Sequence, residues 1–357
     1  MNVSPDWAAM APATRRDRDA APMMPIDTLL RCSGWFLRRR DLLERGYTDA
    51  AMHAALADRS IFRVRQGWYS VPDAPEPAVR AVRVGGRLTS ISALESYGIP
   101  VPRRPDSHIV VKSTASRLRA THDRRKRLAG ARDVRIHWVD RAASADSVWR
   151  VSIDDALLQV LIDEPRDIAV ACASLVMHIE RWTDRRLDAI FARAPHDVRV
   201  WRVLVSALDE SHGETFFRLW TRDAGLLVVQ QVSRRGVGRL DFQIGPHTFV
   251  EVDGGQHDPG WTATASNSWE KDHDRDTTMA IAGDRVLRFT YRQLYGDFTR
   301  ILLAVCRCRA DDLALTTIRN RRPYRVDARR ARVRGILSRS SSRSHAQRKR
   351  RRFTMKP

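Results

Sequence analysis

The chain has 357 residues, of which 43% are hydrophobic, and its formal net charge is +21. This length is enough for two or three domains that each bury a core. No apolar run is long enough to cross a bilayer and no secretory signal is evident, so we expect a cytoplasmic protein with no membrane partner.

The positive charge is concentrated near the C-terminus. Residues 319–357 hold 16 Lys or Arg and one Asp, so this segment carries +15 of the +21. Its Arg/Ser-rich composition cannot bury a core, and we expect a disordered basic tail over residues 311–357. Such a tail would bind polyanions by releasing counterions, although a solvated extension without a role fits it equally well. Residues 1–25 mix Ala, Pro and charge without periodicity, which predicts a disordered leader.

The cysteines indicate neither a disulfide scaffold nor a zinc site. Their four positions lack the paired spacing of zinc ligands and are too few to staple a small fold. We therefore expect four buried, reduced thiols at Cys32, Cys172, Cys306 and Cys308.

Residues 26–75 are predicted to form a winged helix-turn-helix. Helices are expected over residues 27–34, 38–46 and 49–59, the last capped by Thr48, and a hairpin turns at Gln66 and Gly67. The third helix would enter the major groove of DNA, and the hairpin would place basic side chains on phosphates. These side chains are Arg59, Arg63 and Arg65. A structural or protein-binding domain of the same shape is the alternative.

This region resembles the N-terminal domain of AbiEi-type antitoxins and related regulators. The similarity rests on Arg63–Val71, which reads RVRQGWYSV, and on a Ser-x-x-Ala-x-x-x-x-Gly pattern at Ser90–Gly98. It covers about residues 26–100. The resemblance implies a winged helix that binds DNA.

Residues 76–205 are predicted to form a middle α/β packing domain. Strands are expected over residues 107–112 and 134–140, followed by helices over residues 152–165 and 167–182. We find no catalytic constellation in this block. His108, His137 and His178 are each isolated on apolar elements, where a core histidine is commoner than a ligand.

Residues 206–310 predict the order α, β, β, β, α, β. A helix begins at Ser211 and ends at Gly225, and Glu214 occupies the third position of a capping box. Strands follow over residues 226–232, 237–244 and 248–253, then a helix over 267–283, a strand over 285–290 and a closing helix over 291–307. With the first two blocks, the expected fold class is a multidomain α+β or α/β protein.

The hairpin between the second and third of these strands predicts a pair of facing carboxylates. If Ile244 pairs with Thr248, then Asp241 lies opposite Glu251, with both side chains on one face. Two like charges at this separation destabilise a sheet unless a cation neutralises them. Two carboxylates with water suit Mg²⁺ or Mn²⁺, and no small-molecule cofactor is expected.

This block resembles the Vsr-like domains of the PD-(D/E)xK endonuclease superfamily. The matching stretches are Arg239–Asp258 (RLDFQIGPHTFVEVDGGQHD) and Lys271–Leu294 (KDHDRDTTMAIAGDRVLRFTYRQL). The similarity covers about residues 211–308. It implies a restriction-endonuclease-like core that hydrolyses phosphodiester bonds in DNA with a bound metal.

Carried onto this chain, the resemblance makes Asp241 and Glu251 the metal ligands, helped by the carbonyl of Val252. Glu214 would complete the acidic cluster. Arg275, or its neighbour Asp276, would orient a phosphate or a water.

The resemblance also implies that Asp253 and His257 flank the site. Asp253 stands where the superfamily keeps a lysine, which leaves Gln256, His257 or Lys271 to stabilise the developing charge. Each residue has a plainer alternative interpretation: Glu214 as a helix cap only, Asp253 as a turn residue that bonds its own backbone, and His257 as a loop residue. A DNA-binding regulator of antitoxin type with a degenerate nuclease-like domain is the alternative function.

Overall fold

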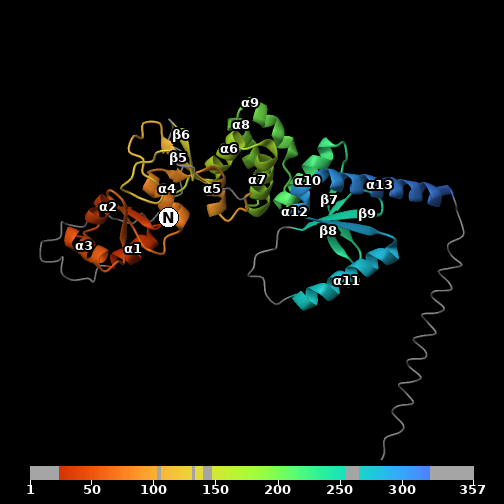
Figure 1. Cartoon of the computed structure of the whole chain (residues 1–357), viewed down its shortest axis with the longest axis horizontal. Helices are drawn as coiled ribbons and strands as arrows, with labels where there is room; N and C mark the ends of the chain where they lie inside the picture. The colour runs from red at the N-terminus through yellow and green to blue at the C-terminus, as the bar shows by residue number, and fades with distance from the viewer. Residues whose placement is uncertain (1–23, 103–105, 131–132, 140–146, 254–264, 322–357) are drawn as a thin grey trace, which may run out of the picture. The chain divides into compact units, whose positions relative to one another are not determined.

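Helices and small sheets alternate along the chain, which confirms the expected α+β class (Figure 1). The structure, a computed structural model, describes residues 24–102, 106–130, 133–139, 147–253 and 265–321, and within these the side chains of residues 265–272 and 315–321 are not described. The chain divides into two units, Met1–Thr215 and Phe216–Pro357. The predicted leader lies almost wholly outside the described residues.

The first unit opens with three helices and a three-stranded antiparallel sheet. The elements are α1 (Ile26–Cys32), β1 (Phe36–Arg38), α2 (Arg39–Glu44), α3 (Asp49–Ala57), β2 (Phe62–Arg65) and β3 (Trp68–Ser70). The strand order is β1-β3-β2. As expected, the Thr48 hydroxyl caps α3, accepting the N–H of Ala51 at 3.2 Å. The short strand β1 was not predicted, because three residues carry too little periodicity to be recognised.

The remainder of the first unit is a small mixed sheet followed by helices. Its elements are α4 (Glu76–Val84), β4 (Arg87–Leu88), α5 (Ser90–Ser96), β5 (Ser107–Lys112), β6 (Val134–Val139), α6 (Ile153–Asp163), α7 (Arg166–Ile179), α8 (Asp184–Arg193), α9 (His196–Arg199) and the 3₁₀ helix η2 (Val200–Leu204). β5 pairs with β4 in the antiparallel sense and with β6 in the parallel sense. A continuous buried core runs from Ile26 to Val198 and therefore joins this part to the first three helices.

The second unit is built on a four-stranded sheet in the order β10-β9-β8-β7. Its elements are α10 (His212–Asp223, which begins in the first unit), β7 (Val229–Arg234), β8 (Gly238–Gln243), β9 (Thr248–Asp253), α11 (Ala265–Ala282), β10 (Arg285–Thr290), α12 (Tyr291–Gly296) and α13 (Phe298–Arg321). Only β10 and β9 are parallel. The predicted order of elements is present. The expected closing helix is divided in two near Asp297, and α13 continues to Arg321, so residues 311–321 are helical rather than a disordered tail.

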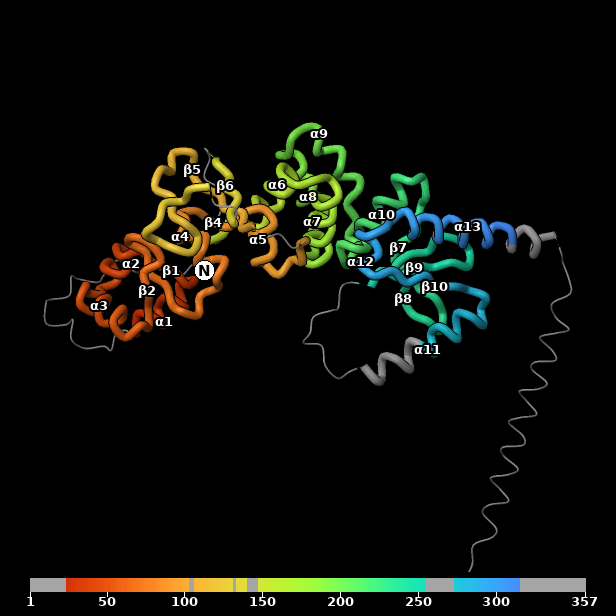
Figure 2. Tube along the Cα trace, in the orientation of Figure 1, coloured from red at the N-terminus to blue at the C-terminus, as the bar shows by residue number. Residues whose placement is uncertain are grey.

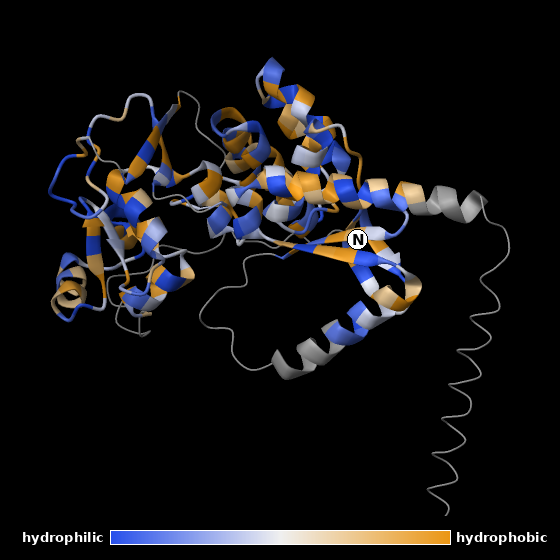
Figure 3. Ribbon diagram, turned by 45° about the vertical axis from the view of Figure 1, so that its right-hand side comes forward, coloured by the Kyte–Doolittle hydropathy of each residue, from blue (hydrophilic) through white to orange (hydrophobic). Residues whose placement is uncertain are grey.

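Helices cover both faces of this sheet (Figure 2). On one face, Phe249 of β9 packs with Met279 of α11. On the other face, the rings of Phe217 on α10 and Phe242 on β8 have centroids 5.0 Å apart. Figure 3 shows the same layering by hydropathy, with largely hydrophobic strands and a described part of α11 that is hydrophilic over much of its length. The buried part of the sheet therefore lies in the central strands β8 and β9, where a buried polar side chain needs a partner.

The cysteines differ from expectation. Cys172 is buried and Cys308 is half-buried, but Cys32 and Cys306 are exposed, so the prediction of four buried thiols is wrong for these two. Both lie on helices, α1 and α13, on the side that faces solvent. All four are free thiols. Among the described residues, no helix has the length and apolar character needed to cross a membrane.

Candidate functional site

The hairpin of β8 and β9 has the predicted register. Ile244 donates its N–H to the carbonyl of Thr248 at 3.0 Å. Phe242 is the Cα partner of Val250, and Gln243 is the partner of Phe249. The turn therefore aligns the two strands as the sequence indicated.

The regular pairing ends one residue later, at Asp241. Asp241 and Glu251 are not among the Cα partners of β8 and β9, so the expected direct pair is not formed in the ladder. Instead, the Asp241 Oδ2 atom accepts the backbone N–H of Val252 at 2.8 Å. At this position the side chain of Asp241, and not a backbone carbonyl of β8, accepts the hydrogen bond from β9.

Strand β8 also changes face at Asp241. Leu240 packs in the cluster that contains Phe249, on the α11 side, whereas Phe242 packs against Phe217 on the α10 side. In a regular strand, residues two apart share a face. The alternation is therefore broken at Asp241, which explains why extrapolating the register from the turn did not give the carboxylate pair.

The neighbouring edge strand shows a related irregularity. Gln230 and Val232 of β7 pair with Phe242 and Leu240, which places Gln231 opposite Asp241. Gln231 has φ of +52°, in the left-handed region. That conformation costs a residue with a side chain about 1–2 kcal/mol, so backbone strain is concentrated beside Asp241.

Glu251 is neutralised by two arginines. Arg275 of α11 donates to its Oε1 at 2.7 Å, and Arg288 of β10 donates to its Oε2 at 2.9 Å. The side chain of Glu251 is only 14% exposed, so its charge requires such partners. Arg288 is the register partner of Glu251 in the parallel pair of β9 and β10.

Arg288 links Glu251 to a second carboxylate. Its two terminal nitrogens donate to Asp276 of α11 at 3.1 and 2.7 Å. The hydrogen bonds to Asp276 and then to Glu251 raise the pKa of Arg288, and the same contact with Arg288 lowers the pKa of Asp276. The site is thus an alternating network of two carboxylates and two guanidinium groups on β9, β10 and α11.

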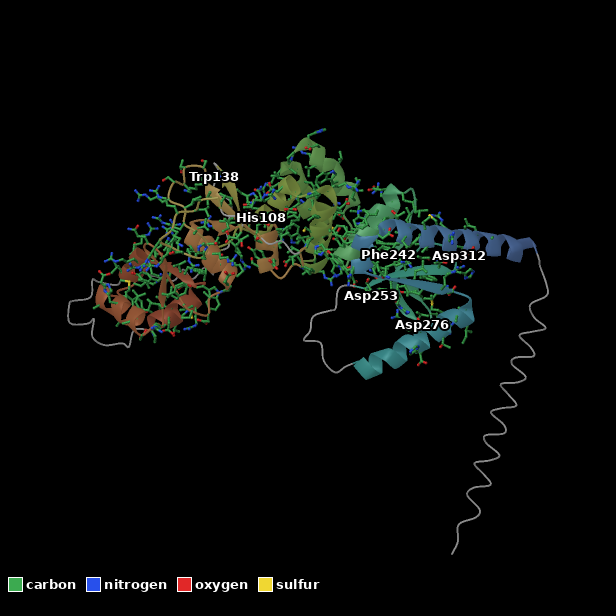
Figure 4. The ribbon with its side chains drawn as sticks, viewed as in Figure 1. His108, Trp138, Phe242, Asp253, Asp276 and Asp312 are labelled. Carbon is green, nitrogen blue, oxygen red and sulfur yellow. The ribbon has the colours of Figure 1, made fainter. Side chains whose placement is uncertain are left out.

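The remaining predicted residues of this site are placed as follows. Asp253 is exposed at the end of β9, where it pairs in register with Thr290. Figure 4 labels Asp253 on β9 and Asp276 on α11. His257 and Gln256 lie outside the described residues, as does the side chain of Lys271.

Glu214 takes part in capping α10. Its N–H donates to the Ser211 hydroxyl at 3.1 Å, and its carboxylate accepts the N–H of Glu210 at 3.1 Å. This is close to the capping arrangement that the sequence indicated. These two hydrogen bonds of Glu214 support its structural interpretation.

The three arginines of the predicted DNA-binding surface have different environments. Arg59 and Arg63 are exposed and line an open cavity of about 770 Å³ together with Arg83 and Arg124. Arg65 is half-buried and donates to the carbonyl of Arg117 at 3.3 Å. Burial lowers the pKa of Arg65, which indicates that this guanidinium is committed to packing.

Comparison with known proteins gives no assignment: no family model matches the chain, and no curated protein matches it significantly.

Sequence reasoning missed one cluster, in the first unit. The Nε2 atom of His137 lies 3.3 Å from Nδ1 of His108, and the His137 Nδ1 atom lies 3.0 Å from Oδ2 of Asp163. The sequence suggested that these two histidines are isolated, and the structure shows that they are not. Both histidines lie on strands, and these two strands are parallel neighbours. Hydrophobic periodicity does not reveal which strands pair, so the sequence did not bring the two residues together.

Proposed function

We propose that this protein is a metal-dependent endonuclease that binds DNA through its N-terminal helices and hydrolyses phosphodiester bonds in its C-terminal unit. The observation that carries the proposal is the arrangement around Glu251. Asp241 and Glu251 stand on adjacent central strands, and two guanidinium groups converge on Glu251 from α11 and β10. Carboxylates for a cation beside arginines for a phosphate are the groups that phosphodiester hydrolysis requires.

The donor set fits a hard divalent cation. Asp241, Glu251 and the carbonyl of Val252 offer only oxygen atoms, as Mg²⁺ and Mn²⁺ prefer. Both oxygens of Glu251 are engaged by arginines, so a bound cation would replace at least one guanidinium as the neutralising charge. When bound, the metal would polarise a phosphate oxygen and activate a water molecule.

The chain's own residues have definite parts in this proposal. The N–H of Val252 fixes the orientation of the Asp241 carboxylate. Arg275 and Arg288 hold Glu251 in place, and either of them, once released, could donate to a phosphate in a bidentate manner. Asp276 keeps Arg288 oriented through two hydrogen bonds.

The N-terminal elements support the DNA-binding part. The order α1, β1, α2, α3, β2, β3 with the sheet order β1-β3-β2 supports the interpretation as a winged helix, in which α3 would lie in the major groove. Arg59 lies between α3 and β2, Arg63 lies on β2, and both are exposed. In this proposal they contact phosphates rather than bases.

A second candidate is a DNA-binding regulator whose nuclease-like unit no longer cuts. One observation favours it: Arg275 and Arg288 together satisfy both oxygens of Glu251, which gives the acidic site an internal neutralisation that needs no cation. This candidate shares the DNA-binding surface and differs only in having no hydrolytic activity.

A plasmid-nicking assay with Mg²⁺ and Mn²⁺ separates the two. The wild-type protein and the matched variant Glu180→Gln, which changes an exposed carboxylate on the first unit, should nick supercoiled DNA equally. Glu251→Gln and Asp241→Asn should abolish nicking while DNA binding by gel shift is retained. Equal nicking by all four proteins would exclude the site. If the wild type binds DNA but does not nick it with either metal, the regulator is the favoured function.

A further inference from the structure

His108 and His137 face one another across a pair of parallel strands. His108 pairs in register with Arg135, and Val110 pairs with His137, so the two histidines occupy diagonal positions on one face of β5 and β6. Their exposed fractions are 1% and 9%, and Figure 4 shows the position of His108 within the first unit. The two rings are therefore buried with ring nitrogens directed at each other.

The separation of these nitrogens matches that of two ligands on one metal ion. The distance from His108 Nδ1 to His137 Nε2 is 3.3 Å. Two nitrogen ligands at about 2.0–2.1 Å from a tetrahedral ion are themselves about 3.3–3.4 Å apart.

Carboxylates lie at the outer nitrogens of both rings. Oδ2 of Asp163, at the end of α6, is 3.0 Å from His137 Nδ1, and Oδ2 of Asp106 is 3.7 Å from His108 Nε2. Gln159 donates to the same oxygen of Asp163 at 2.7 Å and holds that carboxylate toward the histidines. Asp106 lies where a supporting carboxylate of a metal-binding histidine commonly lies. Asp163 would leave its contact with His137 Nδ1 and turn to the ion, which it would bind itself.

Within the described residues, this is the one cluster of three His, Cys, Asp or Glu side chains whose potential ligand atoms converge. Those atoms of His108, His137 and Asp163 all lie within 4.8 Å of one another. The side chain of Asp163 is 19% exposed, which leaves a side from which water can reach the cluster. Two imidazoles and a carboxylate with an open position are a donor set typical of zinc.

We propose that His108, His137 and Asp163 bind a Zn²⁺ ion that ties strands β5 and β6 to the end of α6. The site lies wholly in the first unit and is independent of the proposed nuclease site. The neighbouring side chains of Arg135 and Glu164 lie 3.8 Å apart, and their opposite charges cancel. The negative charge that neutralises the ion is therefore that of Asp163, with Asp106 beside it. Zinc binding therefore stabilises the first unit.

The test is calorimetric titration of Zn²⁺ into the full chain after removal of metals with EDTA. The wild-type protein should bind one ion per chain at this site, and its thermal unfolding should shift upward. His137→Gln should weaken that binding by about 100-fold or more, since even the loss of a supporting residue costs 10–100-fold. The matched control His196→Gln changes an exposed histidine on α9 and should bind as the wild type does.

Two further measurements keep the proposal testable if a buried variant fails to fold. Asp163→Asn alters a partly exposed side chain and retains an acceptor for Gln159, and it should also weaken binding. Co²⁺ added to the wild type should give the visible absorption of a tetrahedral nitrogen–oxygen site, which Zn²⁺ then displaces. Glu251→Gln should leave this binding unchanged. The proposal is overturned if the stripped wild type does not bind Zn²⁺ saturably, or if folded His137→Gln or Asp163→Asn binds it equally well.

Discussion

The carboxylate of Asp312 on α13 accepts the backbone N–H of His247, at 3.0 Å, in the turn between β8 and β9. A Cβ atom on Gly245 would lie 2.5 Å from the same carboxylate oxygen, so the glycine makes room for it. Arg285 donates to the other oxygen at 3.2 Å. A helix distant in sequence thus holds the turn that sets the pairing of Phe242 with Val250 and of Gln243 with Phe249.

The two adjacent carboxylates of α13 should differ in their contribution to stability. Asp312 has a fully buried side chain, whereas Asp311 is 65% exposed, yet both contact Arg285. Asp312→Ala leaves a buried N–H without its acceptor and should lower the free energy of unfolding by about 3 kcal/mol. Asp311→Ala should cost less than about 1 kcal/mol. Urea denaturation of both variants measures the difference, and equal losses would contradict this account of the turn.

Gly85 should not tolerate a side chain. Its φ is +110°, and a Cβ atom there would lie 1.8 Å from a terminal nitrogen of Arg65. The arginine can move, but the left-handed backbone cannot be relieved, so Gly85→Ala should destabilise the protein by about 1–2 kcal/mol. Gly296→Ala is the control, since that glycine ends α12 with open space around it. Thermal unfolding compares them, and a Gly85→Ala protein as stable as the control would refute the prediction.

Arg63 should contribute to DNA binding through charge alone. It is exposed on β2, with a 3.4 Å hydrogen bond to the hydroxyl of Tyr69. Arg63→Ala should weaken binding to all DNA sequences and reduce the slope of log K against log salt by about 1, because one phosphate contact is lost. Fluorescence anisotropy at several salt concentrations measures this slope. Arg185→Ala, an exposed change on α8, should leave it unaltered, and an unaltered slope for Arg63→Ala would remove Arg63 from the DNA surface.

Acid should destabilise the protein partly through His212. Burial lowers the pKa of this histidine to about 4 from an ordinary value of 6.5. Between these values the unfolded chain binds a proton that the folded chain does not, so the stabilising contribution is complete above pH 6.5 and is lost as pH falls toward 4. The loss is at most about 3 kcal/mol.

Urea midpoints at pH 7 and pH 5 test this contribution. His212→Gln should show a smaller decrease between the two values than the wild type does. The exposed His196→Gln variant should follow the wild type. If His212→Gln and the wild type lose stability in parallel, His212 is not a source of the acid sensitivity.

Local signals in the sequence predicted most elements and the hairpin register. Thr48 caps the helix that it was expected to cap, because capping depends on a few neighbouring residues. The turn at Gly245 fixed the pairing of Phe242 with Val250 for the same reason.

The partners of the charged residues could not be predicted in this way. Arg288 reaches Glu251 only because β10 lies parallel to β9, and Arg275 reaches it only because α11 covers that face. The strained Gln231, which accompanies the change of face at Asp241, has no sequence marker, since left-handed residues are usually glycine or asparagine. Long-range contacts, and not local preference, therefore decided how Glu251 is neutralised.

The division between the two units falls inside α10, which has a practical consequence for dissecting the molecule. Phe216 is the first residue of the second unit, yet the helix begins at His212. Its first turn is held by the Ser211 hydroxyl and by the hydrogen bond from Thr215 to Asp209, at 3.0 Å. A fragment that starts at Phe216 would expose the frayed end of a helix whose aromatic side chains pack in the second unit. One that starts before Asp209 keeps the cap and offers the better prospect of assaying the second unit, with its proposed nuclease site, on its own.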